Sequence, residues 1–153
     1  MNDHSTYMRH ALRLAQQAFD RGDWPVASVL VRDNSIIGEG QNRQTTQTDI
    51  TIHAETDALR DAFKRTGTTD LRGATLYSTM EPCPMCAWAM QSAGVKSLVL
   101  GARFADLQST DLGDYTIETF GTMIRAPFNL TQGVLRDECI AIRKTWGKDQ
   151  VKK

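Results

Sequence analysis

Two cysteines, Cys83 and Cys86, stand three positions apart in the stretch TMEPCPMCAWAM, and this pair is the first candidate for chemistry in the sequence. Taken alone, the pair leaves three interpretations open: a thiol redox couple, part of a metal site, or inert buried thiols. A structural zinc site needs four protein ligands and often uses two such pairs, but this chain has one. The remaining thiol, Cys139, follows the pattern of a small buried apolar residue on an amphipathic helix.

A histidine and a glutamate in the stretch ITIHAETDALR shift the balance towards a metal site. His53 and the two thiolates would supply three zinc ligands and leave one tetrahedral position open, as in catalytic zinc sites. Residues two apart inside a helix point roughly 200° apart. His53 and Glu55 can therefore serve one site only from the first turn of a helix. A carboxylate beside zinc-activated water can act as a general acid–base, which is the role expected of Glu55.

The elements that would position these side chains follow from hydrophobic periodicity and turn signals. Strands alternate with helices after an opening hairpin. This order predicts one α/β domain over residues 1–153, a three-layer α-β-α sandwich with a mixed central sheet of about five strands. No element is assigned between Arg103 and Leu130. The predicted helices are Ser5–Phe19, His53–Arg65, Pro84–Gly94 and Leu135–Trp146, and the predicted strands are Val26–Val31, Ile36–Gly40, Ala74–Thr79 and Ser97–Ala102.

Composition limits the class of protein. Lys and Arg number 18 and Asp and Glu number 18, so the formal net charge is zero. Domains that bind nucleic acid through bulk charge usually carry a basic surplus, although zero net charge leaves room for a local basic patch. The start of the sequence has no signal-peptide pattern, and no apolar run approaches the roughly 20 residues of a membrane span. We therefore expect a cytoplasmic protein with reduced thiols and no membrane partner.

The two motifs together resemble a known signature. His-Ala-Glu, followed some thirty residues later by Pro-Cys-Pro-Met-Cys, is similar to the His-x-Glu and Pro-Cys-x-x-Cys pattern of zinc nucleobase deaminases. The resemblance to the cytidine deaminase-like superfamily extends over nearly the whole chain. It implies zinc ligation by His53, Cys83 and Cys86, proton transfer by Glu55, and a homodimer or larger assembly.

Two branches of that superfamily compete for the substrate. The stretches GEGQNRQTTQTDITIHAE and EPCPMC resemble bacterial guanine deaminases, which act on a free base. That likeness implies that Asn42 hydrogen-bonds the base and that Asp114 assists proton transfer. From the residues alone, Asn42 is also a turn former at a strand end, and Asp114 is equally consistent with a solvated loop. The sequence departs from the guanine enzymes in carrying Val26 and in lacking a terminal aromatic residue.

The second branch is the bacterial tRNA adenosine deaminases, which VLVRDNSIIGEGQNR, CAWAM, LVLGAR and LTQGVLRDEC resemble. Those enzymes carry a lysine- and glycine-rich loop after GAR. This sequence instead has the acidic loop FADLQSTDLGD, which would disfavour binding of a polyanion. Trp88 also replaces a small residue, and we interpret it as a core or subunit-interface side chain. The sequence therefore ranks a guanine-type free base first, a tRNA adenosine second and cytosine third. A non-catalytic zinc module and a thiol oxidoreductase are the alternatives from other classes.

Overall fold

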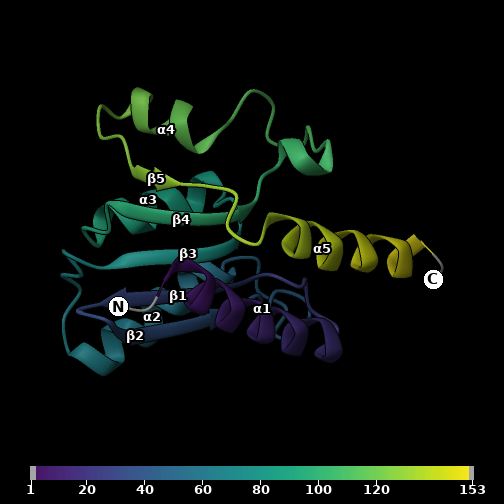
Figure 1. Ribbon diagram of the computed structural model, residues 1–153, viewed down its shortest axis with the longest axis horizontal. Helices are drawn as coiled ribbons and strands as arrows, with labels where there is room; N and C mark the ends of the chain where they lie inside the picture. Colours follow the sequence, from purple (N-terminus) through teal and green to yellow (C-terminus); the bar gives the residue numbers. More distant parts are fainter. Residues whose placement is uncertain (1–2, 152–153) are drawn as a thin grey trace.

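The computed structural model describes the backbone of residues 3–151 and the side chains of residues 3–146. Within that part of the chain, five strands form one sheet in the order β2-β1-β3-β4-β5, from the bottom of Figure 1 to the top. The strand β1 pairs antiparallel with β2 and β3, whereas β3 with β4 and β4 with β5 are parallel. The elements are α1 (His4–Arg21), β1 (Ala27–Arg32), β2 (Ser35–Gln41), α2 (Ala54–Thr66), β3 (Thr75–Met80), α3 (Pro84–Ser92), β4 (Ser97–Ala102), a 3₁₀ turn η1 (Ala105–Leu107), α4 (Ile117–Met123), β5 (Asn129–Thr131) and α5 (Arg136–Val151).

Helices cover both faces of this sheet, which confirms the predicted three-layer sandwich. Side chains alternate between the faces along each strand. Leu30, Leu76 and Leu98 pack against residues of α2, α3 and α4. On the opposite face, Val29 and Val99 pack against residues of α1 and α5. The alternation buries apolar side chains on both faces, so the sheet lies at the centre of the domain.

The predicted elements lie close to the observed ones, with one region missing. The bounds of the hairpin strands β1 and β2, and of β4, lie within a few residues of the predicted ones. The helices α2, α3 and α5 also begin within a few residues of their predicted starts. The segment that received no prediction contains α4 and β5. These elements have 7 and 3 residues, which is too short for a periodic pattern. At the end of the chain, α5 continues to Val151, beyond the predicted end at Trp146.

A glycine in β2 brings α2 unusually close to the sheet. A Cβ atom at Gly40 would lie 2.2 Å from both the Ala54 carbonyl oxygen and the Ala58 amide nitrogen. Any side chain at this position would therefore push the first turn of α2 away from β2. That turn carries Glu55, so the glycine controls the position of a predicted catalytic residue.

Among the described helices, none is both long and apolar enough to cross a membrane.

Candidate active site

The predicted metal ligands lie at the first turns of two helices. His53 is the N-cap of α2 and Cys83 is the N-cap of α3, both with extended backbone, and Cys86 lies in the first turn of α3. Pro84 occupies the first turn of α3, where its fixed φ suits the helix and its missing N–H leaves no bond unmade. Helix N-termini favour negative charge, so both helices support deprotonated thiols at this point.

The three ligand atoms fit a zinc ion. Nδ1 of His53 lies 3.5 Å from Sγ of Cys83 and 3.6 Å from Sγ of Cys86, and the two sulfur atoms are 3.6 Å apart. Tetrahedral zinc with bonds of about 2.3 Å to sulfur and about 2.0 Å to nitrogen requires a sulfur–sulfur distance of about 3.8 Å and sulfur–nitrogen distances of about 3.5 Å. Among the described residues, this is the one group of histidine, cysteine and acidic side chains that could hold a metal. The set has three ligands, which leaves a fourth coordination position for water.

The three ligand side chains strongly perturb each other's protonation. Contact with Cys86, and then with His53, lowers the pKa of Cys83 to about 4. The neighbouring Cys83 sulfur and burial raise the pKa of Cys86. Contact with Cys83 raises the pKa of His53, against the opposing effect of burial. The three groups therefore share protons, and a bound metal ion would displace those protons, because it requires thiolates and a neutral imidazole.

Glu55 lies at the bottom of the site and is almost fully buried, with 3% of its surface exposed. Burial, and then the charge of Cys83, raise the pKa of its carboxyl group. The Ser78 hydroxyl donates a hydrogen bond to Oε1 of Glu55 at 3.0 Å, which fixes one carboxyl oxygen. Ser78, on β3, thus orients a buried carboxyl group that can accept and return a proton.

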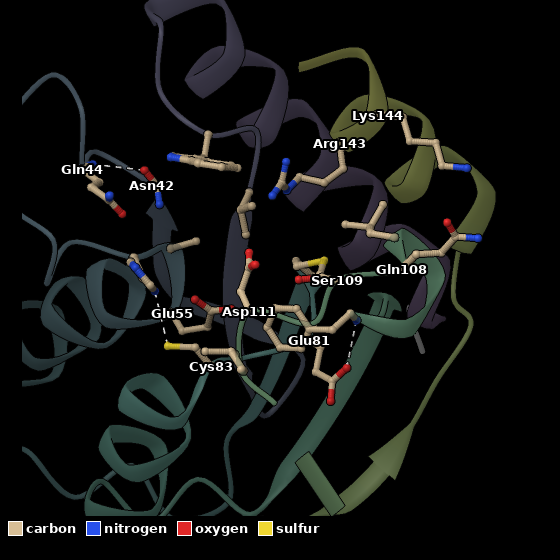
Figure 2. A pocket seen from close by; sticks show the side chains of 18 of the residues that line it. Asn42, Gln44, Glu55, Glu81, Cys83, Gln108, Ser109, Asp111, Arg143 and Lys144 are labelled. Atoms are coloured by element: carbon tan, nitrogen blue, oxygen red, sulfur yellow. Dashed lines mark hydrogen bonds between the residues drawn. The ribbon is translucent and has the colours of Figure 1, made fainter. Parts of the chain in front are cut away.

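A cavity of about 1050 Å³ opens onto His53, Glu55 and Cys83. Asn42 follows β2 and also lines this cavity. Its Oδ1 accepts a hydrogen bond from the Gln44 amide at 3.0 Å (Figure 2). Asn42 therefore forms a turn, as the residue type suggested, and also lines the site. The structure therefore brings together His53, Glu55, Cys83, Cys86 and Asn42.

Asp114 and Trp88 lie elsewhere. Asp114 is exposed and is not among the residues that line the cavity, whereas Asp111 lines it. The proton-transfer role of Asp114 stays a prediction. Trp88 exposes 58% of its surface on α3, close to Met85, which exposes 38%. Its side chain therefore lies outside the core of this chain, and its place in a subunit interface stays a prediction, as does the homodimer.

Sequence reasoning missed a buried anchor beside the metal ligands. The Glu81 carboxylate accepts hydrogen bonds from the amides of Phe104 and Ile117 at 3.1 and 2.8 Å, and from the Arg103 guanidinium at 3.1 and 3.2 Å. The Tyr115 hydroxyl adds a hydrogen bond of 2.5 Å to the Pro82 carbonyl oxygen. These contacts fasten the segment 103–117, part of which lines the cavity, to the loop that carries Cys83. A glutamate directly before the Pro-Cys motif was the available signal.

Sequence reasoning also missed the far wall of the cavity, which Trp24 and Arg143 form with Phe104 and Leu107. Trp24 precedes β1 and Arg143 belongs to α5. Nothing in the sequence joins these two positions, because the fold alone brings them together.

Comparison with known proteins agrees with this geometry. Residues 1–102 match the family model for the cytidine and deoxycytidylate deaminase zinc-binding region. The chain belongs to this zinc-binding deaminase family. The matched residues contain all three ligands and Glu55, so the expected cofactor of this deaminase-family protein is zinc.

Named relatives of this deaminase-family chain include both tRNA adenosine deaminases and a guanine deaminase. It is 41% identical to a tRNA-specific adenosine deaminase of Haemophilus influenzae over 133 residues, which covers 86% of this chain and 76% of the relative. It is 38% identical to a guanine deaminase of Bacillus subtilis over 113 residues, or 73% and 72% of the two chains. A solved structure from a study of A-to-I editing by tRNA:A34 deaminases superimposes with a TM-score of 0.79 at 31% identity, covering 90% of this chain and 99% of that one.

Proposed function

We propose that this protein is a hydrolytic deaminase that replaces an exocyclic amino group of a nucleobase with oxygen and releases ammonia. The observation that carries this proposal is the three-ligand site with a buried carboxyl group beside it at the base of a cavity. When bound by His53, Cys83 and Cys86, zinc supplies a water molecule that is deprotonated near neutral pH.

The protein side chains supply the proton transfers and the orientation. Glu55 takes a proton from the attacking water and delivers it to the ring nitrogen. It then moves the remaining proton of the added hydroxyl to the amine, which departs as ammonia. The Ser78 hydroxyl holds the carboxyl group in place during these transfers. The Asn42 amide group, whose Oδ1 is already used in its own turn, faces the cavity and orients the base. The overall change is addition of water and loss of ammonia.

An adenosine of tRNA is the first candidate substrate. The relative of 41% identity, named a tRNA-specific adenosine deaminase, matches 86% of this chain. The cavity of about 1050 Å³ also exceeds what a single base fills, because sites for drug-sized ligands measure about 300–1,000 Å³. The order of candidates drawn from the sequence, with a free base first, is therefore reversed. Asp114 lies outside the cavity lining and has no step in this mechanism.

A free purine base of the guanine type is the second candidate. The guanine deaminase of Bacillus subtilis is 38% identical over nearly three quarters of this chain. The exposed acidic residue Asp111, which lines the cavity, also disfavours a polyanionic substrate.

A panel of substrates separates these candidates. Ammonia release by the zinc-loaded protein is measured on two anticodon hairpins, one with adenosine and one with guanosine at the wobble position. The panel also contains adenine, guanine, cytosine and the nucleosides of these three bases. Release from the adenosine hairpin alone supports the first candidate. Release from guanine but from neither hairpin refutes it in favour of the second, and no release from any compound contradicts deamination of these substrates.

A further inference from the structure

Among the side chains of residues 3–146, a cation in the cavity, Arg143, has no anionic partner. Arg143 lies half-buried on α5 and lines the same cavity as His53 and Glu55. Among residues 3–146, no carboxylate lies within ion-pairing distance of its guanidinium, and no hydrogen bond to it is formed. Arg103, in contrast, is held by Glu81 and Glu118. Arg143 therefore keeps its five N–H donors for something outside the described chain.

An aromatic cluster holds the guanidinium in place. Its carbon atom lies 4.2 Å from the centre of the Trp24 ring, a cation–π contact. The Trp24 ring in turn packs beside Trp146, with ring centres 6.1 Å apart, and Trp146 meets Phe19 at 5.7 Å. Because the guanidinium stacks on the ring through its flat face, its N–H donors still point outward in the guanidinium plane and can bind a ligand there.

The direction of the side chain also points to the cavity. Arg143 reaches from α5 towards the centre of the cavity, whereas its neighbour Lys144 extends the other way (Figure 2). Partial burial lowers the pKa of the Arg143 guanidinium. A desolvated cation without a counter-ion is unfavourable, and a bound anion offsets that cost. Asp111 lines the same cavity but is exposed and forms no ion pair with Arg143.

We propose that Arg143, stacked on Trp24, binds a phosphate group of the substrate while the base lies at Glu55. A guanidinium binds phosphate through two parallel hydrogen bonds, which makes it a specificity element for a nucleotide unit over a free base. The inference rests on the proposed function, because it places a nucleobase at Glu55. The phosphate belongs either to a mononucleotide or to one residue of an RNA chain.

Binding of reaction products tests this without turnover. The affinities of hypoxanthine, inosine, inosine 3′-monophosphate and inosine 5′-monophosphate are measured by calorimetry on zinc-loaded full-length protein. A charged hydrogen bond contributes on the order of 1.5–3 kcal/mol, so at least one monophosphate is expected to bind about tenfold or more tightly than inosine. Arg143→Met is expected to abolish this advantage and leave inosine affinity within about twofold. Arg143→Lys keeps the charge but not the planar fork, and is expected to restore part of the advantage.

A second arm identifies the source of the phosphate. An anticodon hairpin with inosine at the wobble position is titrated over a range of salt concentrations. If Arg143 contacts an RNA phosphate, Arg143→Met lowers the slope of log affinity against log salt by about 0.7–0.9. The control is Arg13→Met, which removes the same charge from an exposed position on α1 and is expected to change neither quantity.

The outcomes separate the two proposals. A phosphate advantage or a salt slope that depends on Arg143 supports the inference, even if no compound in the panel releases ammonia, in which case the deaminase proposal alone fails. The inference is overturned if neither quantity depends on Arg143. It is also overturned if Arg143→Met weakens all four products by the same factor, which is the result of a purely structural role.

Discussion

The anchor at Glu81 makes the sharpest stability prediction. Its carboxylate is 3% exposed and accepts hydrogen bonds from two backbone amides and from Arg103. Removing one partner of a buried ion pair costs about 3–5 kcal/mol. Here the two amides lose their acceptor, and Arg103 keeps the half-exposed Glu118 as its ion-pair partner. Glu81→Ala is therefore expected to lower the free energy of unfolding by about 3–5 kcal/mol. For a protein of this size, this corresponds to a fall in Tm of about 6–20 °C.

The same arginine provides a matched control. Glu118 also pairs with Arg103, at 2.6 Å, but half of the Glu118 side chain is exposed. Exposed ion pairs contribute about 0–1 kcal/mol, so Glu118→Ala is expected to lower the unfolding free energy by no more than about 1 kcal/mol. Urea denaturation followed by circular dichroism measures both variants. Equal losses in the two variants, or a loss below about 1 kcal/mol for Glu81→Ala, would refute the view that burial makes Glu81 the anchor.

Three further predictions follow from the site and its supports. Gly40→Ala is expected to displace the first turn of α2 and lower turnover at least about tenfold, because the added Cβ would meet backbone atoms at 2.2 Å. The control is Gly22→Ala at the exposed end of α1, where the added Cβ meets no atom within 4 Å and only backbone strain is tested. Cys86→Ala is expected to lose stoichiometric zinc by atomic absorption, whereas Cys139→Ala, which changes a buried thiol outside the ligand set, keeps it. Burial alone would raise the pKa of Asp23, but hydrogen bonds from Thr46 and the charge of Arg21 hold that pKa below its usual range. Because the folded-state pKa is the lower one, Asp23 stabilises the fold above about pH 4 and this contribution is lost at lower pH; the unfolding free energies of wild type and Asp23→Asn are thus expected to converge on acidification.

The candidate metal-binding group could be predicted from the sequence because ligand chemistry restricts residue type and spacing. Two thiols three apart and a histidine two before a glutamate suit the first turns of two helices, and His53 and Cys83 are indeed N-caps. The alternation of strands and helices predicted the layers, since each element buries its apolar face against the sheet.

The far wall of the cavity could not be predicted in this way. Trp24 and Arg143 lie on opposite ends of the chain, and a tryptophan in a turn or an arginine on a terminal helix is unremarkable by itself. The role of Glu81 depends on the path of segment 103–117, where the short α4 and the loop before it leave no periodic signal. Long-range contacts between polar side chains are visible only after the fold is known.

Glu55 is proposed to carry the proton for a zinc-dependent deamination, and the most direct test of this role is the turnover of Glu55→Gln at full zinc occupancy. Zinc content and ammonia release are measured on the same preparation, with the best substrate of the panel. We predict one zinc ion per chain and a rate lower by about 10²–10⁴-fold, the contribution typical of general acid–base catalysis. Full ammonia release from zinc-loaded Glu55→Gln would contradict the account.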